Sequence, residues 1–169
     1  MDVFEAVRTV LAVRSYQERP IPDDVVRRIV EAGRLTASSM NLQPWQFVVA
    51  QDRGTLRRLG ELARSGPYIA DAPLAIVVAV EKASRFAVSD ASRAIQSMVL
   101  AAWADGVGSN WAGFSGLDEV GKLLDMPAGL DVLAVIPFGY PAKAGGRGKK
   151  KRKPINEVIH RERFGQPFE

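Results

Sequence analysis

The sequence predicts one domain of mixed helices and strands, of the α/β or α+β class. Amphipathic stretches with apolar residues three or four positions apart indicate helices, and short apolar runs between turn residues indicate strands. Residues 74–80 (LAIVVAV) are the clearest such run, because continuous apolarity predicts a central strand covered on both faces. The length of 169 residues fits a single domain over residues 1–169.

The first part of the chain predicts two helices separated by an extended connector. Residues 2–12 form a short helix with its apolar residues on one face. Residues 14–21 are extended, since Pro20 disfavours helix in the residue before it. Residues 22–35 form the second helix, because Pro22 suits a first helical turn and two aspartates follow it there.

The middle of the chain predicts a polar turn at 36–43, a strand at 46–51 and an amphipathic helix at 53–65. After the apolar run comes the longest helix, at 89–106, with Ser89 as its N-cap. Glycines at the end of this helix stop it.

The last part predicts a short strand or loop at 109–114, a helix from Ser115 to about Asp125, and a strand at 132–138. Ser115 and Asp118 have the spacing of a capping box, which places the start of the helix.

The C-terminal end combines a solvated loop with an apolar tail. A short helix is expected at 154–160, and Phe164 and Phe168 follow it. Such a tail needs apolar surface to cover. Folding back on its own sheet and reaching across to a partner subunit both satisfy that need.

The positive charge is concentrated in one place. The formal net charge is +4, and six of the seven residues at 147–153 (RGKKKRK) are basic. The rest of the chain is close to neutral, which indicates a local anion site and no dispersed nucleic-acid surface. Neither a signal peptide nor a transmembrane run of about 18 apolar residues is visible, so a cytoplasmic protein without membrane partners is expected.

Most side-chain chemistry is excluded by composition. The chain has no cysteine and a single histidine, His160, so thiolate sites and histidine-rich metal sites are excluded and no metal is expected. No G-x-S-x-G elbow and no G-x-G-x-x-G fingerprint occur. A bound cofactor would then have to supply the reactive chemistry.

Two stretches in the first third resemble the nitroreductase family. VRSYQERPIPDDVVRRIVEAG carries an Arg-x-aromatic element ahead of Pro-Ile-Pro and a helix. TASSMNLQPWQFVV, at 36–49, carries the pattern Ser-x-x-Asn-x-Gln-Pro-Trp followed by a strand, which is the most specific of the signals.

Two further stretches extend this resemblance to residue 165. DASRAIQSMVLAAWADGVGSNWAGF is similar to the central helix of the family and to the segment beside its flavin ring. IPFGYPAKA, KKRKP and EVIHRERFG resemble the closing strand, the basic loop and the C-terminal arm.

The resemblance implies an α+β fold of three layers, α-β-α, around a mostly antiparallel sheet. It also implies an intertwined homodimer with an exchanged C-terminal arm, at about 154–169, and two FMN sites at the subunit interface. NADH or NADPH would reduce the flavin at N5. A nitro compound, a quinone or a similar small acceptor would then be reduced at the same face, in a ping-pong reaction.

Cationic residues of this sequence match flavin ligands of the family. Arg14 would lie beside flavin N1 and O2 and stabilise the negative charge that reduction places there. This role is electrostatic support, and no residue of the protein itself is expected to be catalytic. Lys150 and Arg152 would bind the FMN phosphate, as a point charge and a bidentate fork. Without the resemblance, Arg14 reads as a surface residue, and the basic run reads as a solvated or nucleic-acid-binding patch.

Polar and small residues complete the expected site. Ser38, Ser39 and Asn41 would donate hydrogen bonds to phosphate or ribityl oxygens, partly across the dimer, and Gln43 would reach the polar rim of the flavin. Turn formation and helix C-capping are a strong rival explanation for the two serines and the asparagine, because these residue types favour such sites. Trp45 is interpreted as core.

The segment at Ala112 and Gly113 matches the family segment whose backbone amide faces flavin N5. A small residue followed by glycine permits a close approach of the backbone to a ligand.

One departure from the family stands at Val10, Leu11 and Ala12, where Arg-Arg-Ser is common. Its loss removes two cations and a hydroxyl from the expected site, and charge-assisted hydrogen bonds are worth roughly 1.5–3 kcal/mol each. The alternative function is therefore a flavin-binding protein of the same fold with little turnover. A nucleic-acid-binding module built on residues 147–153 is a third and weaker hypothesis.

Overall fold

The computed structural model describes residues 1–113, 115–143 and 150–168. Part of the basic run, Arg147–Lys149, lies outside the described residues, as does Phe114 of the predicted segment 109–114. The helices are α1 (Val3–Thr9), α2 (Asp23–Arg34), α3 (Arg53–Leu62), α4 (Ala87–Ala104) and α5 (Leu117–Leu123). The strands are β1 (Trp45–Ala50), β2 (Leu74–Glu81), β3 (Gly108–Ser109) and β4 (Leu130–Gly139). Short 3-10 turns are η1 (Ser39–Asn41), η2 (Pro67–Asp71) and η3 (Ile155–Glu157).

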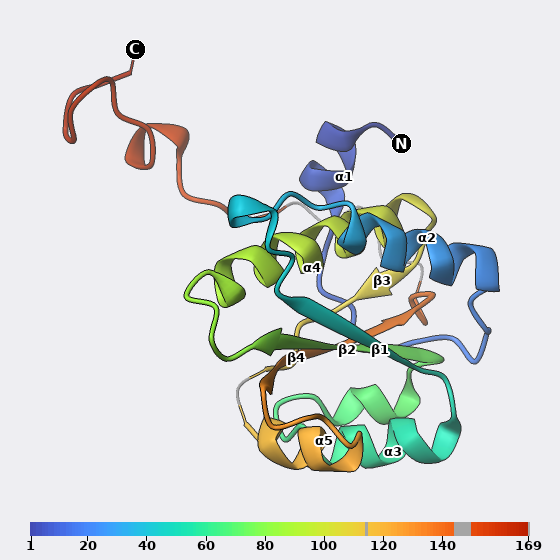
Figure 1. Ribbon diagram of the computed structural model, residues 1–169. Helices are drawn as coiled ribbons and strands as arrows, with labels where there is room; N and C mark the ends of the chain where they lie inside the picture. The colour runs from blue at the N-terminus through green and yellow to red at the C-terminus, as the bar shows by residue number, and fades with distance from the viewer. Residues whose placement is uncertain (114, 144–149, 169) are drawn as a thin grey trace.

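The fold has three layers around an antiparallel sheet. The strand order is β1-β2-β4-β3, and each neighbouring pair is antiparallel. Helices α2 and α4 cover one face of the sheet, and α3 and α5 cover the other (Figure 1). The expected α+β, three-layer architecture is therefore confirmed.

Strand β2 lies at the centre of the core, because the side chains on its two faces pack in two different apolar clusters. Leu74, Ile76 and Val78 pack with α2 and α4, whereas Ala75 and Val77 pack with α3 and α5. All five side chains are fully buried. This alternation confirms that the continuous apolar run is a central strand covered on both sides.

The first helix is shorter than predicted and its apolar face is not buried within the chain. It ends at Thr9, because Ala12 pairs with Ser109 of β3 and Val13 N donates to Ser109 O at 2.8 Å. Val3 and Phe4 are 77% and 76% exposed. The expectation of a helix through residue 12 was wrong, because the residues after Thr9 are extended where the chain pairs with β3.

The predicted start of α4 was also wrong. The helix begins at Ala87, and Ser89 is an interior residue whose Oγ donates to Phe86 O at 3.0 Å. A turn closed by Ala87 N and Ser84 O at 3.1 Å starts the helix early, which buries Ala87 against the sheet.

The predicted capping box of α5 does not form. The residue before Leu117 is Gly116, with φ of 79°, and no side chain caps the helix. A Cβ built on Gly116 would lie 1.8 Å from Leu62 O, so only glycine permits α3 and α5 to approach here.

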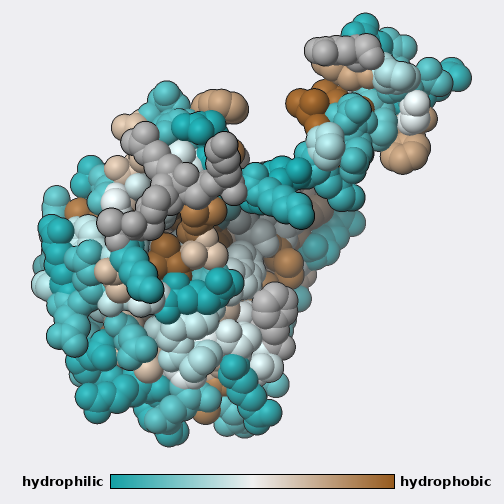
Figure 2. All heavy atoms as spheres, turned by 180° about the vertical axis from the view of Figure 1, so that it is seen from behind, coloured by the Kyte–Doolittle hydropathy of each residue, from teal (hydrophilic) through white to brown (hydrophobic). Residues whose placement is uncertain are grey.

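The C-terminal arm, residues 154–168, stands away from the sheet of its own chain (Figure 1). The predicted helix at 154–160 is only the 3-10 turn Ile155–Glu157. Its apolar side chains are exposed, with Phe164 at 92%, and Figure 2 shows apolar surface both on the arm and on the body next to it. Of the two arrangements that the sequence left open, folding back on its own sheet is not the one observed.

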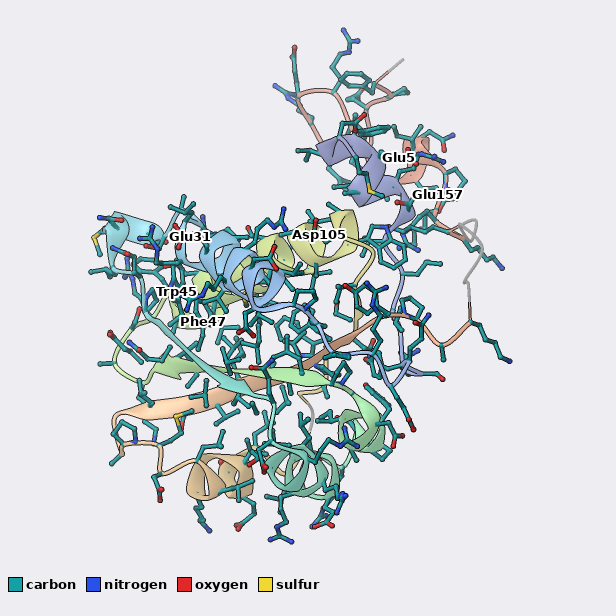
Figure 3. The ribbon with its side chains drawn as sticks, turned by 90° about the vertical axis from the view of Figure 1, so that its right-hand side faces the viewer. Glu5, Glu31, Trp45, Phe47, Asp105 and Glu157 are labelled. Carbon is teal, nitrogen blue, oxygen red and sulfur yellow. The ribbon has the colours of Figure 1, made fainter. Side chains whose placement is uncertain are left out.

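Figure 3 shows that α1 and the arm project on the same side of the molecule, beyond α2 and α4. Over the described ranges, no helix is long and apolar enough to cross a membrane.

Candidate functional site

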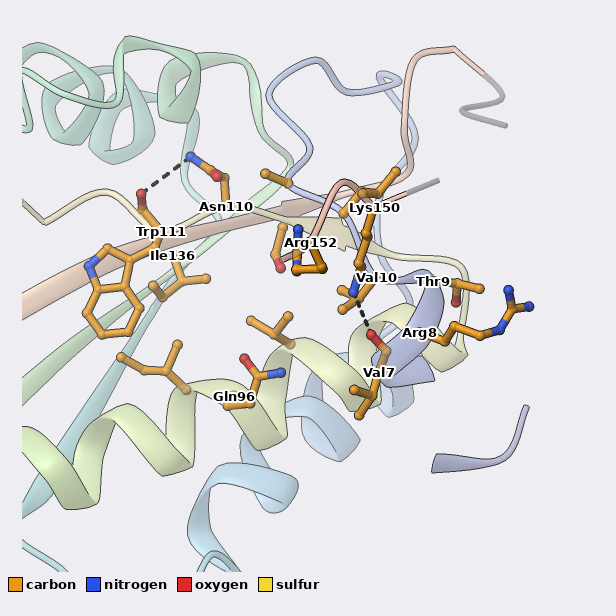
Figure 4. A pocket seen from close by; sticks show the side chains of 15 residues that line it. Val7, Arg8, Thr9, Val10, Gln96, Asn110, Trp111, Ile136, Lys150 and Arg152 are labelled. Carbon is orange, nitrogen blue, oxygen red and sulfur yellow. Dashed lines mark hydrogen bonds between the residues drawn. The ribbon is translucent and has the colours of Figure 1, made fainter. Parts of the chain in front are cut away.

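A cavity of about 880 Å³ opens between the end of α1, the middle of α4 and the segment after β3 (Figure 4). This volume lies within the range of about 300–1,000 Å³ that is typical of ligand and cofactor sites. Its walls include Val7–Ala12, Ile95, Gln96, Val99, Ser109–Trp111, Ile136, Lys150 and Arg152.

Two of the predicted cofactor-binding residues, Lys150 and Arg152, line this cavity. The Lys150 ammonium donates to Val7 O, where the end of α1 leaves carbonyl groups without helical partners. Burial lowers the pKa of Lys150, and the neighbouring Arg152 lowers it further. An anion bound between the two cations would offset both effects, because it stabilises the charged ammonium.

The departure from the family pattern lies inside the same cavity. Val10, Leu11 and Ala12 form part of its wall, held there by the pairing of Ala12 with Ser109. Arg8, two residues before Val10, also lines the cavity, but its guanidinium forms an ion pair with Glu5 at 2.8 Å and points away from Lys150 in Figure 4. The cavity wall is therefore apolar where the family commonly places cations.

The predicted residues Ala112 and Gly113 directly follow the wall residues Ser109–Trp111, but neither of them lines the cavity. Ala112 is fully buried and exchanges two backbone hydrogen bonds with Val135, at 3.0 and 2.8 Å. A Cβ on Gly113 would lie 2.5 Å from Trp111 Nε1 and 3.1 Å from Leu133 O, so a side chain does not fit there. Because the Ala112 amide is committed to Val135, the amide of Gly113 is the better candidate for a ligand contact.

Sequence reasoning missed Asn110 and Trp111, which lie between β3 and Ala112. Both line the cavity, and Trp111 is 36% exposed. A tryptophan two residues before a glycine, just after a short strand, was the available signal, since an aromatic ring there can form a flat wall for a planar ligand.

The structure places Arg14 outside the main cavity, in a neighbouring pocket of about 700 Å³. Its guanidinium lies 6.0 Å from the centre of the Tyr68 ring, and Asn110 Nδ2 donates to the Tyr68 hydroxyl. Tyr68 thus connects Arg14 to the cavity wall. The connector is held firmly, because Tyr16 is buried and donates to Val13 O at 2.7 Å.

Tyr16 itself stays protonated. Burial raises the pKa of its hydroxyl well above the usual range, and the nearby Tyr68 adds to the shift while Arg14 opposes it. The residue is a structural support for the backbone around Arg14, with no acid or base role at ordinary pH.

The predicted polar residues at 38–43 lie in a loop around η1, at the N-terminal end of α4. Gln43 N donates to Ser38 Oγ at 2.9 Å, and Gln43 Nε2 donates to Asn41 Oδ1 at 3.3 Å. The described lining of the cavity includes no residue of this loop. Within one chain, then, the cations and the polar loop are not brought together.

Trp45, which begins β1, is part of the core as interpreted from the sequence. It is 6% exposed and its ring stacks with that of Phe47, with centroids 6.4 Å apart. In the part of the chain that the structure describes, no cluster of three or more His, Cys, Asp or Glu side chains could hold a metal ion.

Comparison with known proteins supplies the family. The sequence model of the family described as "Nitroreductase family" matches residues 8–67 and 65–140. This chain belongs to the nitroreductase family.

Relatives agree with this membership. The chain is 35% identical over 154 residues to a Methanothermobacter thermautotrophicus protein named "Putative NADH dehydrogenase/NAD(P)H nitroreductase", covering 86% of this chain and 81% of that one. It is 25% identical to "FMN reductase [NAD(P)H]" of Bacillus subtilis, covering 96% of this chain and 74% of that one. A Bacteroides thetaiotaomicron crystal structure with the first of these names has a TM-score of 0.89 and 28% identity, covering 96% and 98% of the two chains.

Proposed function

We propose that this nitroreductase-family protein is an FMN-dependent oxidoreductase that uses NADH or NADPH to reduce a small oxidised acceptor such as a nitro compound or a quinone. The observation that carries the proposal is the cavity of about 880 Å³, which has a cation pair at one end and largely apolar walls. FMN combines a phosphate dianion with a flat, largely apolar ring, so it matches both features. When bound, it supplies a hydride acceptor at N5.

The residues of this chain would divide the work of holding the cofactor. Lys150 and Arg152 would bind the phosphate, because both already line the cavity and burial disfavours the charge on Lys150 without an anion. Trp111 and Gly113 would border the ring. Arg14, held against Tyr68, would stabilise negative charge at the polar end of the flavin.

Donor and acceptor would use one binding place over the same flavin face in turn, as the resemblance to the family implies. This arrangement predicts ping-pong kinetics, with the oxidised nicotinamide leaving before the acceptor binds.

A homodimer would complete the site. The polar loop, with Ser38, Ser39, Asn41 and Gln43, lies apart from the cavity of its own chain and would serve the cavity of a second copy. The exposed apolar side chains of α1 and of the C-terminal arm, with Phe4 at 76% and Phe164 at 92%, are the surfaces that such a copy would cover.

The second candidate is a flavin-binding protein of the same fold with little turnover. The apolar wall formed by Val10, Leu11 and Ala12 favours it, because this wall lacks the expected cations.

The visible absorption spectrum of the purified protein, after addition of FMN and removal of the excess, tests both candidates. Retained flavin bands that NADH or NADPH bleaches and a quinone or nitroarene restores are the expected result. Retained bands that no acceptor restores at a useful rate would favour the binding protein, and a colourless protein would exclude both.

A further inference from the structure

A buried carboxylate fastens the loop of residues 38–43, here called the η1 loop, to helix α4. Asp90 lies in the first turn of α4 and is fully buried. It accepts hydrogen bonds from Ser39 N at 3.0 Å and from Ser39 Oγ at 3.1 Å, and Arg93 donates to the same carboxylate. Burial alone would raise the pKa of Asp90, but the hydrogen bonds from Ser39 and Arg93 hold it below the usual value.

The backbone of the η1 loop needs such a tie. Met40, Asn41 and Gln43 all have positive φ, at 52°, 57° and 51°. Left-handed backbone is unfavourable for residues other than glycine, although asparagine tolerates it better. No glycine occurs between residues 38 and 43, so hydrogen bonds within the loop and its contacts with Asp90 have to offset this cost.

The hydrogen bonds of the loop divide its two serines into different roles. Ser39 donates both its backbone N–H and its hydroxyl proton to Asp90, so neither donor is left for a ligand oxygen. Ser38 Oγ instead accepts from Gln43 N, which leaves the hydroxyl proton of Ser38 for another acceptor. Asn41 likewise accepts from Gln43 through Oδ1, which leaves its amide N–H groups as donors.

We propose that Asp90 is the positioning residue of the η1 loop and that Ser39 is its anchor, whereas Ser38 and Asn41 are the donors that meet the cofactor. This inference rests on the proposed function, because it takes FMN as the ligand. The ionised Asp90 keeps the loop in its left-handed shape before the ligand arrives. Binding then orders few additional groups, and such preorganisation raises the affinity for FMN because less conformational entropy is lost.

The variant Asp90→Asn tests the proposal because it keeps the size of the side chain and removes its charge. We expect faster amide hydrogen exchange over residues 38–43 in the flavin-free protein, since the anchor is weakened. We also expect FMN to bind about tenfold more weakly, as measured by quenching of flavin fluorescence.

Asp52→Ala is the control, because it removes the carboxylate that caps α3, whereas asparagine would cap the helix as well as aspartate does. Asp52 at the start of α3 accepts from Thr55 N at 2.7 Å and from Thr55 Oγ1 at 3.0 Å, which is the pair of donors that Ser39 offers Asp90, but the Asp52 side chain is exposed. This variant should lose thermal stability, with no change in the Kd for FMN or in exchange over the η1 loop. If both variants weaken FMN binding in proportion to lost stability, the role of Asp90 is merely structural and the proposal is overturned.

The serines supply the second comparison. Ser39→Ala should speed exchange over the η1 loop and weaken FMN binding, and it replaces Asp90→Asn if that variant does not fold. Ser38→Ala should weaken FMN binding. It should leave amide hydrogen exchange in the first turn of α4, which contains Asp90, unchanged. Exchange that stays unchanged in Ser39→Ala would overturn the anchor.

The two proposals fail in distinguishable ways. If the unmodified protein binds no FMN, the proposed function fails and the assignment of Ser38 and Asn41 as cofactor donors fails with it. If it binds FMN, and Asp90→Asn exchanges faster with a Kd unchanged within about twofold, the proposed function stands and the positioning role is overturned.

Discussion

The two sides of the candidate site, the cavity and the η1 loop, differ in polarity and in shape. The cavity side is a hollow with apolar walls and two cations, Lys150 and Arg152, at one end. The loop side, residues 38–43, is a compact polar turn whose groups are hydrogen-bonded to one another and to Asp90. One side offers space and charge, and the other offers directed donors. We propose that a second copy of the chain brings the two sides together.

The largest expected effect comes from removing residues 154–168. If the arm holds two copies together, the truncated protein should be a monomer in light scattering, with a mass below the 18.4 kDa of one full chain, whereas the full-length protein should have twice the mass of one full chain. FMN affinity should fall at least a hundredfold, because the cavity then loses the loop of the partner. Circular dichroism should show an intact fold, and a truncated protein that remains dimeric would contradict the arm exchange.

The second effect concerns the cavity side alone. Lys150→Ala combined with Arg152→Ala should weaken FMN binding about a hundredfold or more, since each charge-assisted contact is worth roughly 1.5–3 kcal/mol. Riboflavin, which lacks the phosphate, should bind as before. Lys151→Ala is the control, because Lys151 is exposed between the two and does not line the cavity. An equal loss for riboflavin would show that the phosphate binds elsewhere.

A third and smaller effect should come from restoring a cation. Leu11→Arg places a guanidinium in the apolar wall of the cavity, and FMN should bind about tenfold more tightly while riboflavin does not. Leu35→Arg adds the same charge at a side chain that is 66% exposed at the end of α2. If both variants tighten FMN binding alike, the gain is a general effect of net charge.

The smallest effect is a pH dependence. Burial and Arg152 lower the pKa of Lys150 in the folded protein, so its ammonium loses a proton at a lower pH than the usual value of about 10.4. FMN affinity should therefore fall as pH rises through the lowered pKa of Lys150, and this fall should begin before the usual lysine pKa is reached. Lys150→Arg should remove this dependence, because arginine stays charged.

Protein stability should show the opposite sign. Between the lowered pKa of Lys150 and the usual lysine value the unfolded chain binds more protons, so the free energy of unfolding rises with pH in that window. Urea unfolding of the flavin-free protein and of Lys150→Ala over the same pH range would isolate this contribution. A parallel pH dependence in both proteins would contradict the assignment to Lys150.

Local pattern was sufficient for the layers of the fold and insufficient for several boundaries. Strand β2 was predictable because seven consecutive apolar residues fit little else than a strand covered on both faces. The start of α4 was not predictable from the sequence, because Ser89 has the chemistry of an N-cap but burial of Ala87 decides where the helix begins. The start of α5 depends on the approach of Leu62 to Gly116, which is a contact between distant residues.

The same division applies to the site. The sequence by itself determined the family resemblance, the cations Lys150 and Arg152, and the lack of cations at Val10–Ala12, because these are matters of residue type and spacing. Only the tertiary structure decided that the two cations and the apolar wall share one cavity, that Arg14 lies 6.0 Å from the centre of the Tyr68 ring, and that Asp90 accepts hydrogen bonds from Ser39. The reason is physical: a hydrogen bond or a cavity joins residues about 50 or more positions apart, and no local pattern encodes which of them meet.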